Sequence, residues 1–267
     1  MTRRNPATRA ALSLPNRPRR IVTLTPALAE QVCALGLSRR LAGVSIRSEH
    51  PPSLSRKPCV GSLHDPGLER ILALRPDLVL ASRELNRQET VRKLRRRNVR
   101  VVVVPAYSTC AHVLRVFCRL GARLGRAARA RRIAARAARI LRPREGRSAR
   151  VFVQVWTRPL LGIAGLSYIH EFIKLCGGKN VLAGRRGRVV QVSEREIVRA
   201  NPEIILITLA NAAPEIRRWR RHPRLAAAQN GRILAIPAYW VSPSPLALLR
   251  GARELRRILH LVRPGLK

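Results

Sequence analysis

Two histidines lie where an imidazole could contact a bound molecule or coordinate a metal. His50 precedes Pro51-Pro52, which imposes an extended or turn backbone and presents the side chain at a strand end. His170 lies at the start of a predicted helix that runs through Leu175. Each half of the chain thus offers one imidazole, and the two could clamp a metal centre. The alternatives are an exposed loop histidine at position 50 and a helix-capping or core histidine at position 170.

Aromatic residues are scarce, at 3% of the chain, so their positions are informative. Trp156 and the pair Tyr239-Trp240 directly follow predicted strands, where α/β proteins bind ligands. Tyr168 lies two residues before His170. Flat rings at these positions would supply stacking area for a ligand, and core packing is the alternative. Trp219 lies in an arginine-rich helix, and we predict a structural role for it.

Another polar group follows a predicted strand over 78–81. Arg83 and Arg87 lie in this segment, and the guanidinium fork suits carboxylate or phosphate groups of a ligand. The alternative for both is the solvated first turn of a helix.

No catalytic set emerges from the sequence. There is no G-x-S-x-G, H-E-x-x-H or G-x-x-x-x-G-K motif, and no pair of carboxylates is placed near a histidine. The five cysteines have no C-x-x-C or metal-finger spacing, so we predict small buried hydrophobic residues in place of a disulfide framework or a metal cluster. We therefore predict a protein that is not an enzyme and has no intrinsic cofactor.

The charge of the chain is extreme: 54 Lys+Arg stand against 14 Asp+Glu, a formal net charge of +40. Such a balance is typical of proteins that bind nucleic acid or anionic membranes. However, arginine is scattered through every segment without interleaved aromatics, which favours a general arginine bias on solvated surfaces. Either origin predicts non-specific binding to polyanions. Hydrophobic residues make up 46% of the chain, enough for a core, and no apolar run is long enough for a transmembrane helix.

An internal repeat defines the elements that must position these residues. Three segments of the first half recur in the same order in the second half, the later two at offsets of 126 and 132 residues. The pairs are 21–24 with 151–154, 71–80 with 197–206, and 98–107 with 230–239. The longer units combine a helix or turn with a continuous apolar run, which suits a strand buried on both faces of a parallel sheet.

The repeat predicts an α/β fold with two similar lobes, each with a mostly parallel sheet covered by helices. We expect a flexible basic tail over 1–19, lobes over 20–107 and 144–267, and one backbone helix over 108–143. Apolar residues recur at helical spacing in this last segment, and a helix of that length spans about 50 Å. Such a rod would limit opening and leave a largely preformed ligand cleft between the lobes, although Gly121 and Gly125 could break or bend it.

Many short motifs along residues 19 to 260 resemble one family of proteins. They include Arg20–Pro26, His50-Pro51-Pro52, Leu68–Ala81, Tyr168-Ile169-His170 and Leu175–Val181. The chain is similar to periplasmic cobalamin- and siderophore-binding proteins of the helical-backbone metal receptor type. In similar cobalamin binders an aromatic residue at the position of His50 faces the corrin.

The resemblance implies a monomeric substrate-binding protein of an ABC importer, which binds cobalamin or a ferric chelate and delivers it to the permease transmembrane subunits. It also implies an acidic docking residue on each lobe. Glu69 occupies the first position, but its counterpart at an offset of 126 is Arg195, flanked by Glu194 and Glu196. We expect Glu69 and one of these two glutamates to mediate docking, against the repulsion that the charge of the chain would cause.

Localisation follows from the resemblance alone. It implies the periplasm, but the N-terminal sequence has no convincing signal peptide. The alternative is therefore a cytosolic, arginine-rich derivative of this fold that binds nucleic acid or another polyanion. A third reading, an enzyme with a nitrogenase-type cluster, lacks suitably placed cysteines.

Overall fold

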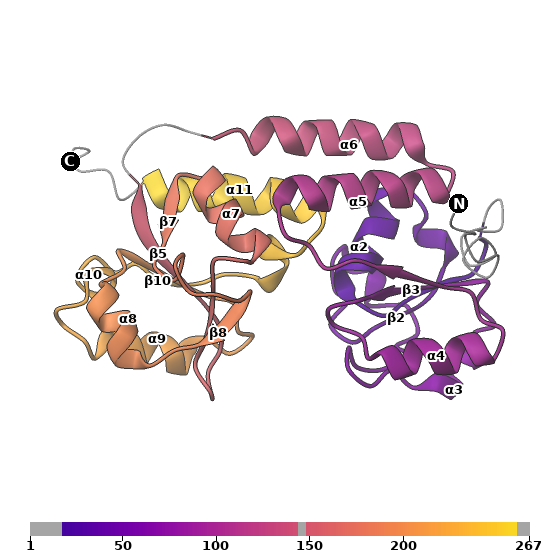
Figure 1. The fold of residues 1–267 in the computed structure, drawn as a ribbon, viewed down its shortest axis with the longest axis horizontal. Coiled ribbons are helices and arrows are strands. Elements are labelled where there is room, and N and C mark those ends of the chain that lie inside the picture. Colours follow the sequence, from indigo (N-terminus) through magenta and orange to yellow (C-terminus); the bar gives the residue numbers. More distant parts are fainter. Residues whose placement is uncertain (1–17, 144–147, 261–267) are drawn as a thin grey trace, which may run out of the picture. The chain divides into compact units, whose positions relative to one another are not determined.

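A computed structural model describes residues 18–143 and 148–260 of the chain (Figure 1). These residues form two compact units. Of the described residues, the first unit contains 18–106 together with Arg115–Ala134, and the second contains Tyr107–Leu114 together with 135–143 and 148–260. Most of the tail predicted over 1–19 lies outside the described residues. Within the described ranges, no helix has the length and apolar character needed to cross a membrane.

The first unit is built on a four-stranded parallel sheet with strand order β2-β1-β3-β4. Its strands are β1 (Ile21–Thr23), β2 (Leu41–Val44), β3 (Leu78–Ser82) and β4 (Val101–Val104). The helices α3 and α4 cover one face, and α2 covers the other together with part of α5 (Figure 1). The helical elements up to β4 are α2 (Pro26–Ala34), η1 (Ser38–Arg40), η2 (Pro52–Leu54), α3 (Leu68–Ala73) and α4 (Gln88–Arg96).

The second unit has a six-stranded sheet, with the path β10-β9-β5-β6-β8 and β7 paired to β5. Its strands are β5 (Ala149–Trp156), β6 (Leu161–Ile163), β7 (Gly178–Asn180), β8 (Val189–Gln191), β9 (Ile204–Ile207) and β10 (Ile233–Ala235). The pairs that involve β6 are antiparallel and the others are parallel. Its helical elements are α7 (Tyr168–Leu175), α8 (Glu194–Ala200), α9 (Ala213–Arg220), α10 (Ala226–Gln229), η3 (Ala238–Val241) and α11 (Pro245–His260).

The duplication and the α/β class predicted from the sequence are confirmed. The repeated segments form β1 and β5, then α3-β3 and α8-β9, then β4 and β10. The first strand of each set pairs in parallel with the second, in the registers Ile21 to Leu78 and Val151 to Ile204. Both β3 and β9 are buried along their whole length, as their unalternating apolar residues require.

The same turn occurs in both units. It precedes the second repeated strand and is hydrogen-bonded to the start of the first. The carboxylate of Asp77 accepts hydrogen bonds from the backbone N–H groups of Arg19 (2.5 Å) and Arg20 (3.1 Å). Glu203 accepts one from the N–H of Arg150 at 3.0 Å. In return, the N–H groups of Asp77 and Glu203 donate to the carbonyls of Arg20 and Arg150. The acid after each proline therefore satisfies the backbone donors at the start of the neighbouring strand.

The two turns also share a backbone conformation and a hydrogen bond from an arginine side chain. The Nε groups of Arg20 and Arg150 each donate to a carbonyl of the preceding helix end, at 2.9 Å. Arg75 and Asn201, at matching positions, both adopt a left-handed conformation, with φ of 44° and 43°. The proline followed by an acidic residue therefore marks a turn that stabilises the fold, and not a ligand site.

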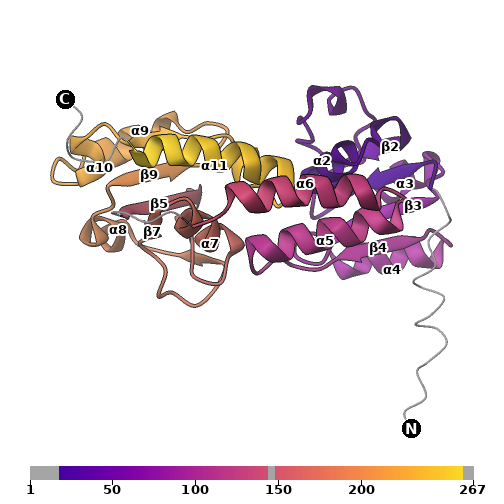
Figure 2. The same cartoon turned by 90° about the horizontal axis from the view of Figure 1, so that it is seen from above.

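The single backbone helix expected over 108–143 is instead two helices, α5 (Cys110–Arg123) and α6 (Ala127–Ile140). Gly125 has φ +70°, and the N–H groups of Arg126 and Gly125 donate to the carbonyls of Gly121 and Ala122. This pattern is a Schellman motif, which ends a helix at a left-handed glycine. The methyl of Ala130 lies 2.3 Å from where a Cβ on Gly121 would sit, so the small residue lets α6 pack closely against α5 (Figures 1 and 2).

The five cysteines are free thiols, and their burial only partly follows the prediction. Cys110 and Cys176 are buried, and burial raises the pKa of the Cys176 thiol to about 12. Cys33 and Cys118 are partly exposed, and Cys59 is exposed, so the expectation of uniform burial is wrong for these three.

Candidate ligand-binding site

In the first unit, the predicted ligand residues follow two strands that flank β1. His50 is half-buried in the loop between β2 and η2. Arg83 and Arg87 are exposed just beyond β3, and Arg87 is the residue before the first turn of α4. Neither guanidinium group has a hydrogen-bond or ion-pair partner among the described residues, although the backbone N–H of Arg83 donates to the carbonyl of Val104. The carboxyl end of this sheet therefore offers one imidazole and two available guanidinium groups.

A buried amide that sequence reasoning missed holds this edge in place. Asn86 accepts a hydrogen bond from the N–H of Ser82 at 2.7 Å. Its amide donates to the carbonyls of Leu24 (3.2 Å) and Leu63 (2.7 Å). One side chain thus ties together the ends of β1 and β3 and a third loop. Its only signal in the sequence was a polar residue between Leu85 and Arg87.

In the second unit, Trp156 ends β5 and is 53% exposed, which is unusual for so large an apolar side chain. Its indole N–H donates to the carbonyl of Arg158 at 3.1 Å, which restricts the ring. An ordered aromatic surface at the end of a parallel strand is suited to stacking against a flat ligand.

Tyr168 and His170 lie in the first turn of α7, which Ser167 caps by accepting a hydrogen bond from the N–H of Ile169. Tyr168 is buried, its hydroxyl donates to the carbonyl of Val241, and its ring packs edge-on against Tyr107. Its observed contacts therefore serve the packing of the second unit.

The imidazole of His170 is partly buried. Burial, and then the charge of Lys174, lower its pKa, while Glu171 opposes them, so the neutral ring is favoured. Its Nδ1 is buried without a hydrogen-bond partner in the described part of the chain. His50 belongs to the first unit and His170 to the second. No group of three or more His, Cys, Asp or Glu among the described residues could hold a metal ion.

Tyr239 and Trp240 lie in η3, directly after β10, and both are half-buried. Trp240 lines an apolar hollow together with Phe172 and Leu255, so part of its ring belongs to the core. Of the predicted ring contacts in this unit, Trp156 is the most exposed.

The predicted docking residues differ between the units. Glu69 on α3 has a side chain 78% exposed, and its nearest cation, on Arg97, is 4.0 Å away. Glu194 pairs with Arg218 at 2.6 Å and contacts His222, and Glu196 pairs with Arg185 at 2.5 Å. Arg195, between these two glutamates, is exposed and has no partner among the described residues.

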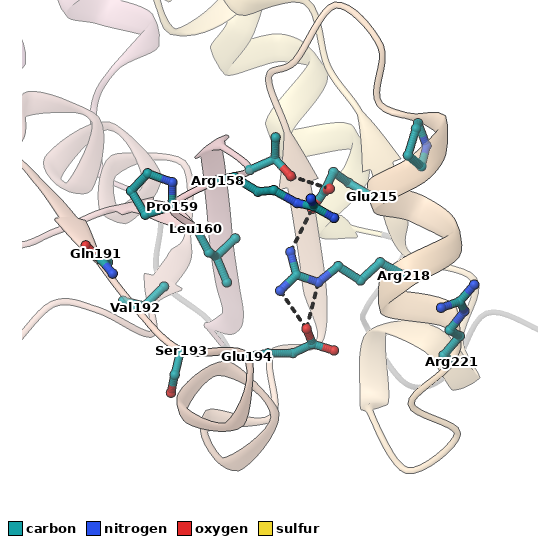
Figure 3. A pocket seen from close by; sticks show the side chains of 12 residues that line it. Arg158, Pro159, Leu160, Gln191, Val192, Ser193, Glu194, Glu215, Arg218 and Arg221 are labelled. Carbon is teal, nitrogen blue, oxygen red and sulfur yellow. Dashed lines mark hydrogen bonds and ion pairs between the residues drawn. The ribbon is translucent and has the colours of Figure 1, made fainter.

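Glu194 borders a cavity of about 690 Å³ in the second unit, also lined by Arg158, Arg218 and Arg221 (Figure 3). Burial is the largest influence on the pKa of Glu194 and raises it. The hydrogen bonds from His222 and Arg218 and the charge of Arg218 together outweigh burial, and the pKa lies below its ordinary value of 4.5. Glu194 is therefore an ionised, internally engaged carboxylate.

Glu215 anchors the other side of the same cavity. It accepts hydrogen bonds from Thr157 (2.5 Å) and Gln154 (2.6 Å), and Arg218 bridges it to Glu194. Gln154 in turn accepts from the indole N–H of Trp219 at 2.8 Å. Trp219 is fully buried, which confirms its predicted structural role. Only a glutamine within the apolar run of β5 indicated this network in the sequence.

Comparisons with known proteins agree on one family. The family profile described as "Periplasmic binding protein" matches residues 21–240. A vitamin B12-binding protein of Pectobacterium carotovorum is 29% identical over 257 residues, which cover 93% of this chain and 91% of that protein.

Solved structures show the same fold. The periplasmic vitamin B12-binding protein of Vibrio cholerae superposes with a TM-score of 0.77 at 23% identity, covering 94% of this chain and all of that one. A periplasmic heme-binding protein from a Roseiflexus species superposes with a TM-score of 0.79 at 20% identity, covering 90% and 99% of the two chains.

Proposed function

The chain belongs to the periplasmic binding protein family, and we propose that it binds cobalamin or a related metal chelate and delivers it to the permease of an ABC importer. The names of the relatives and structural neighbours, vitamin B12-binding and heme-binding proteins, support a flat metal-bearing ligand. They equally support the periplasm as its compartment. Nothing in these comparisons supports the alternative of a cytosolic nucleic-acid-binding protein.

The observation that carries the proposal is the exposed ring of Trp156 at the carboxyl end of β5. A tryptophan 53% exposed in a chain so poor in aromatics is costly in water unless a ligand covers it. In the second unit, further ligand contacts come from Tyr239 and Trp240 after β10. On α7, Tyr168 and His170 contact the ligand or hold the residues that contact it. His50, Arg83 and Arg87 supply contacts from the first unit.

Titration of the purified protein tests the ligand class. We expect cobalamin to quench tryptophan fluorescence and to shift the corrin absorption band, with haem and a ferric siderophore as comparison ligands. Trp156→Ala should weaken cobalamin binding about tenfold, because stacking and burial of the ring are lost. Val189→Ala removes another exposed apolar side chain of the same unit and should leave affinity unchanged. Equal effects of the two substitutions, or no binding of any of the three ligands, would refute the proposal.

The two imidazoles can be tested separately from affinity. If His50 or His170 coordinates the ligand's metal, its replacement by alanine changes the absorption bands of the bound ligand and not only its affinity. A spectrum of the complex that neither substitution alters would exclude a metal-coordinating role for both residues.

Docking to the permease is the second part of the proposal. Glu69 is the accessible acidic residue on α3, and Glu194 or Glu196 would act on α8. With permease reconstituted in liposomes, Glu69→Arg should reduce uptake at least about tenfold through charge repulsion, without changing ligand affinity. Glu89→Arg makes the same charge change at an exposed site on α4 and serves as the matched control. Normal uptake with Glu69→Arg would contradict this docking contact.

A further inference from the structure

One long segment of this chain contains no acidic residue. Between Glu89 and Glu145 there is no Asp or Glu, and this span includes all of α5 and α6. In α5, Arg115, Arg119 and Arg123 follow one another at a spacing of four residues, so like charges are neighbours on one helix face. Such repulsion weakens an isolated helix, and no carboxylate in the segment relieves it.

The outward face of α6 consists of arginine and alanine. Its buried stripe contains Ala130, Ala134, Ala137 and, just past the helix, Leu141. The opposite side presents four exposed arginines, namely Arg131, Arg132, Arg136 and Arg139. None of these four guanidinium groups has a hydrogen-bond or ion-pair partner within the described ranges. The face therefore carries concentrated positive charge with only small side chains between the guanidinium groups.

The face continues into a hollow in the first unit, at the start of α6. This cavity of about 470 Å³ is lined by Arg126, Arg129 and Arg132 and by Gly36 and Gly125. The Nε of Arg129 donates to the carbonyl of Ala34 at 2.6 Å, which restrains its guanidinium group. Three guanidinium groups around a concavity form a setting in which a phosphate group can receive several charged hydrogen bonds.

Some cations elsewhere in the chain pair with an acidic neighbour, whereas the segment that contains α5 and α6 has no acidic residue of its own. Lys93 pairs with Glu89 in α4, Arg218 with Glu194 and Glu215 beside α9, and Arg257 with Glu254 in α11. The span over 90–144, which contains α5 and α6, is the longest stretch of the sequence without Asp or Glu.

We propose that the arginine face of α6 binds the headgroups of an anionic phospholipid bilayer, with a headgroup phosphate in the hollow formed by Arg126, Arg129 and Arg132. The binding is electrostatic and superficial, because the large apolar side chains exposed among the described residues lie outside α5 and α6. The choice of a membrane rests on the proposed function, since a permease partner lies in a bilayer.

The composition of the face argues against nucleic acid as its partner. Proteins that bind single strands stack bases on exposed aromatic rings, and α6 has none. The one aromatic residue of α5, Phe117, is fully buried. A bilayer presents phosphates in a plane and needs no stacking surface, so it matches a row of arginines on a helix.

Co-sedimentation with vesicles tests the proposal. The probe is about one-third phosphatidylglycerol in phosphatidylcholine, compared with phosphatidylcholine alone. We expect binding to the anionic vesicles that is lost between about 0.1 and 0.5 M salt. Replacing Arg131, Arg132, Arg136 and Arg139 together by glutamine should weaken binding at least about 50-fold, since each arginine near the bilayer surface contributes up to about fivefold.

The matched control removes the same charge from dispersed, exposed sites: Arg56, Arg70, Arg199 and Arg253, each replaced by glutamine. This variant should lose no more than about fivefold in vesicle binding. Equal losses in the two variants would overturn the proposal, because net charge alone would then explain binding. Cobalamin titration of both variants reports separately on the ligand site, so failure of the membrane proposal and failure of the ligand proposal give different results.

Hydrogen exchange of the unmodified protein provides a test without substitutions. Anionic vesicles should protect the amides of α6 and its preceding turn more than those of α4. If inorganic phosphate at the same ionic strength protects the amides of α6 as much as the vesicles do, the hollow binds a free anion and the bilayer proposal is overturned. Tighter binding to an RNA oligonucleotide than to vesicles, at equal phosphate concentration, would overturn it in favour of nucleic acid.

Discussion

The two units share a framework turn but present opposite charges on the helix beside it. Asp77 and Glu203 perform the same hydrogen bonding, and Arg20 and Arg150 the same side-chain contact. The helix before each turn differs: α3 presents Glu69, whereas α8 presents Arg195 at the equivalent position.

The turn and the exposed helix position are under different structural constraints. The turn must satisfy backbone groups at the start of a buried strand, so an acid is needed in both units. An exposed helix position has no such requirement, and its charge is open to selection by a partner. At this one position a partner would thus meet an acidic side chain on α3 and a basic one on α8, where Glu194 and Glu196 flank Arg195 and are themselves paired with arginines.

Truncating a buried core residue in each unit should give the largest effects. Trp219→Ala in the second unit should destabilise by about 4 kcal/mol and leave Gln154 without its indole donor. Leu94→Ala in the first, where an aliphatic residue fills the core beneath α4, should cost about 3 kcal/mol. Chemical denaturation of both variants measures the two values. A smaller cost for Trp219→Ala would mean that the second core collapses to fill the space.

Removing the acid of the duplicated turn should have the next largest effect. Glu203 is the more buried of the two, so Glu203→Ala should cost about 2–3 kcal/mol and Asp77→Ala about 1–2 kcal/mol. Denaturant midpoints of the two variants would rank them. If neither variant shifts the midpoint, water satisfies the backbone donors instead, and the acidic residue does not stabilise the turn.

The left-handed residue of the turn should respond to glycine with opposite sign in the two units. Arg75→Gly relieves an unfavourable φ and should stabilise by about 0.5 kcal/mol. Asn201→Gly should destabilise by about 1 kcal/mol, because the Asn201 side chain accepts a hydrogen bond from the N–H of Ala226 at 2.8 Å. Thermal unfolding distinguishes the two, and a shift in the same direction would show that φ alone governs this position.

The smallest effect expected is a difference in acid sensitivity. The pKa of Glu194 is held below 4.5, so its contribution to stability is present above pH 4.5 and is lost as the pH falls through the lowered value. Glu194→Gln should therefore flatten the fall in stability below pH 4.5. Glu69→Gln makes the same substitution at a side chain that is 78% exposed and serves as the matched control. Parallel profiles for the two variants would rule out the Glu194 network as an acid-sensitive element.

The strands were predictable from sequence because each is a continuous apolar run that occurs twice in the chain. Burial on both faces leaves no polar alternation, and the Pro-acid turn marks where each helix ends. The backbone helix was not predicted correctly, since its apolar spacing continues through Leu124 and only the backbone of Gly125 ends it. Helical periodicity identifies which side chains can be buried, but it does not distinguish one long helix from two helices packed together.

The candidate site was predictable only where position along a strand decides exposure. Trp156 ends β5 and is exposed as expected, whereas Tyr168, equally aromatic, is buried by contacts with Tyr107 and Val241 that are distant in sequence. The hydrogen bonds of Asn86, and of Glu215 with Gln154, also join separate loops and strands. Local patterns could not indicate these partners.

The layering of the first unit has one further consequence. Its sheet lies between α3 and α4 on one face and α2 and α5 on the other, and α6 packs outside α2 and α5 (Figure 1). A copy moored to lipid through α6 would turn Glu69 away from the bilayer. Lipid attachment and delivery to the permease would then be alternating states of one molecule, and an acidic bilayer would act as a reservoir that slows uptake while keeping the loaded carrier close to the membrane.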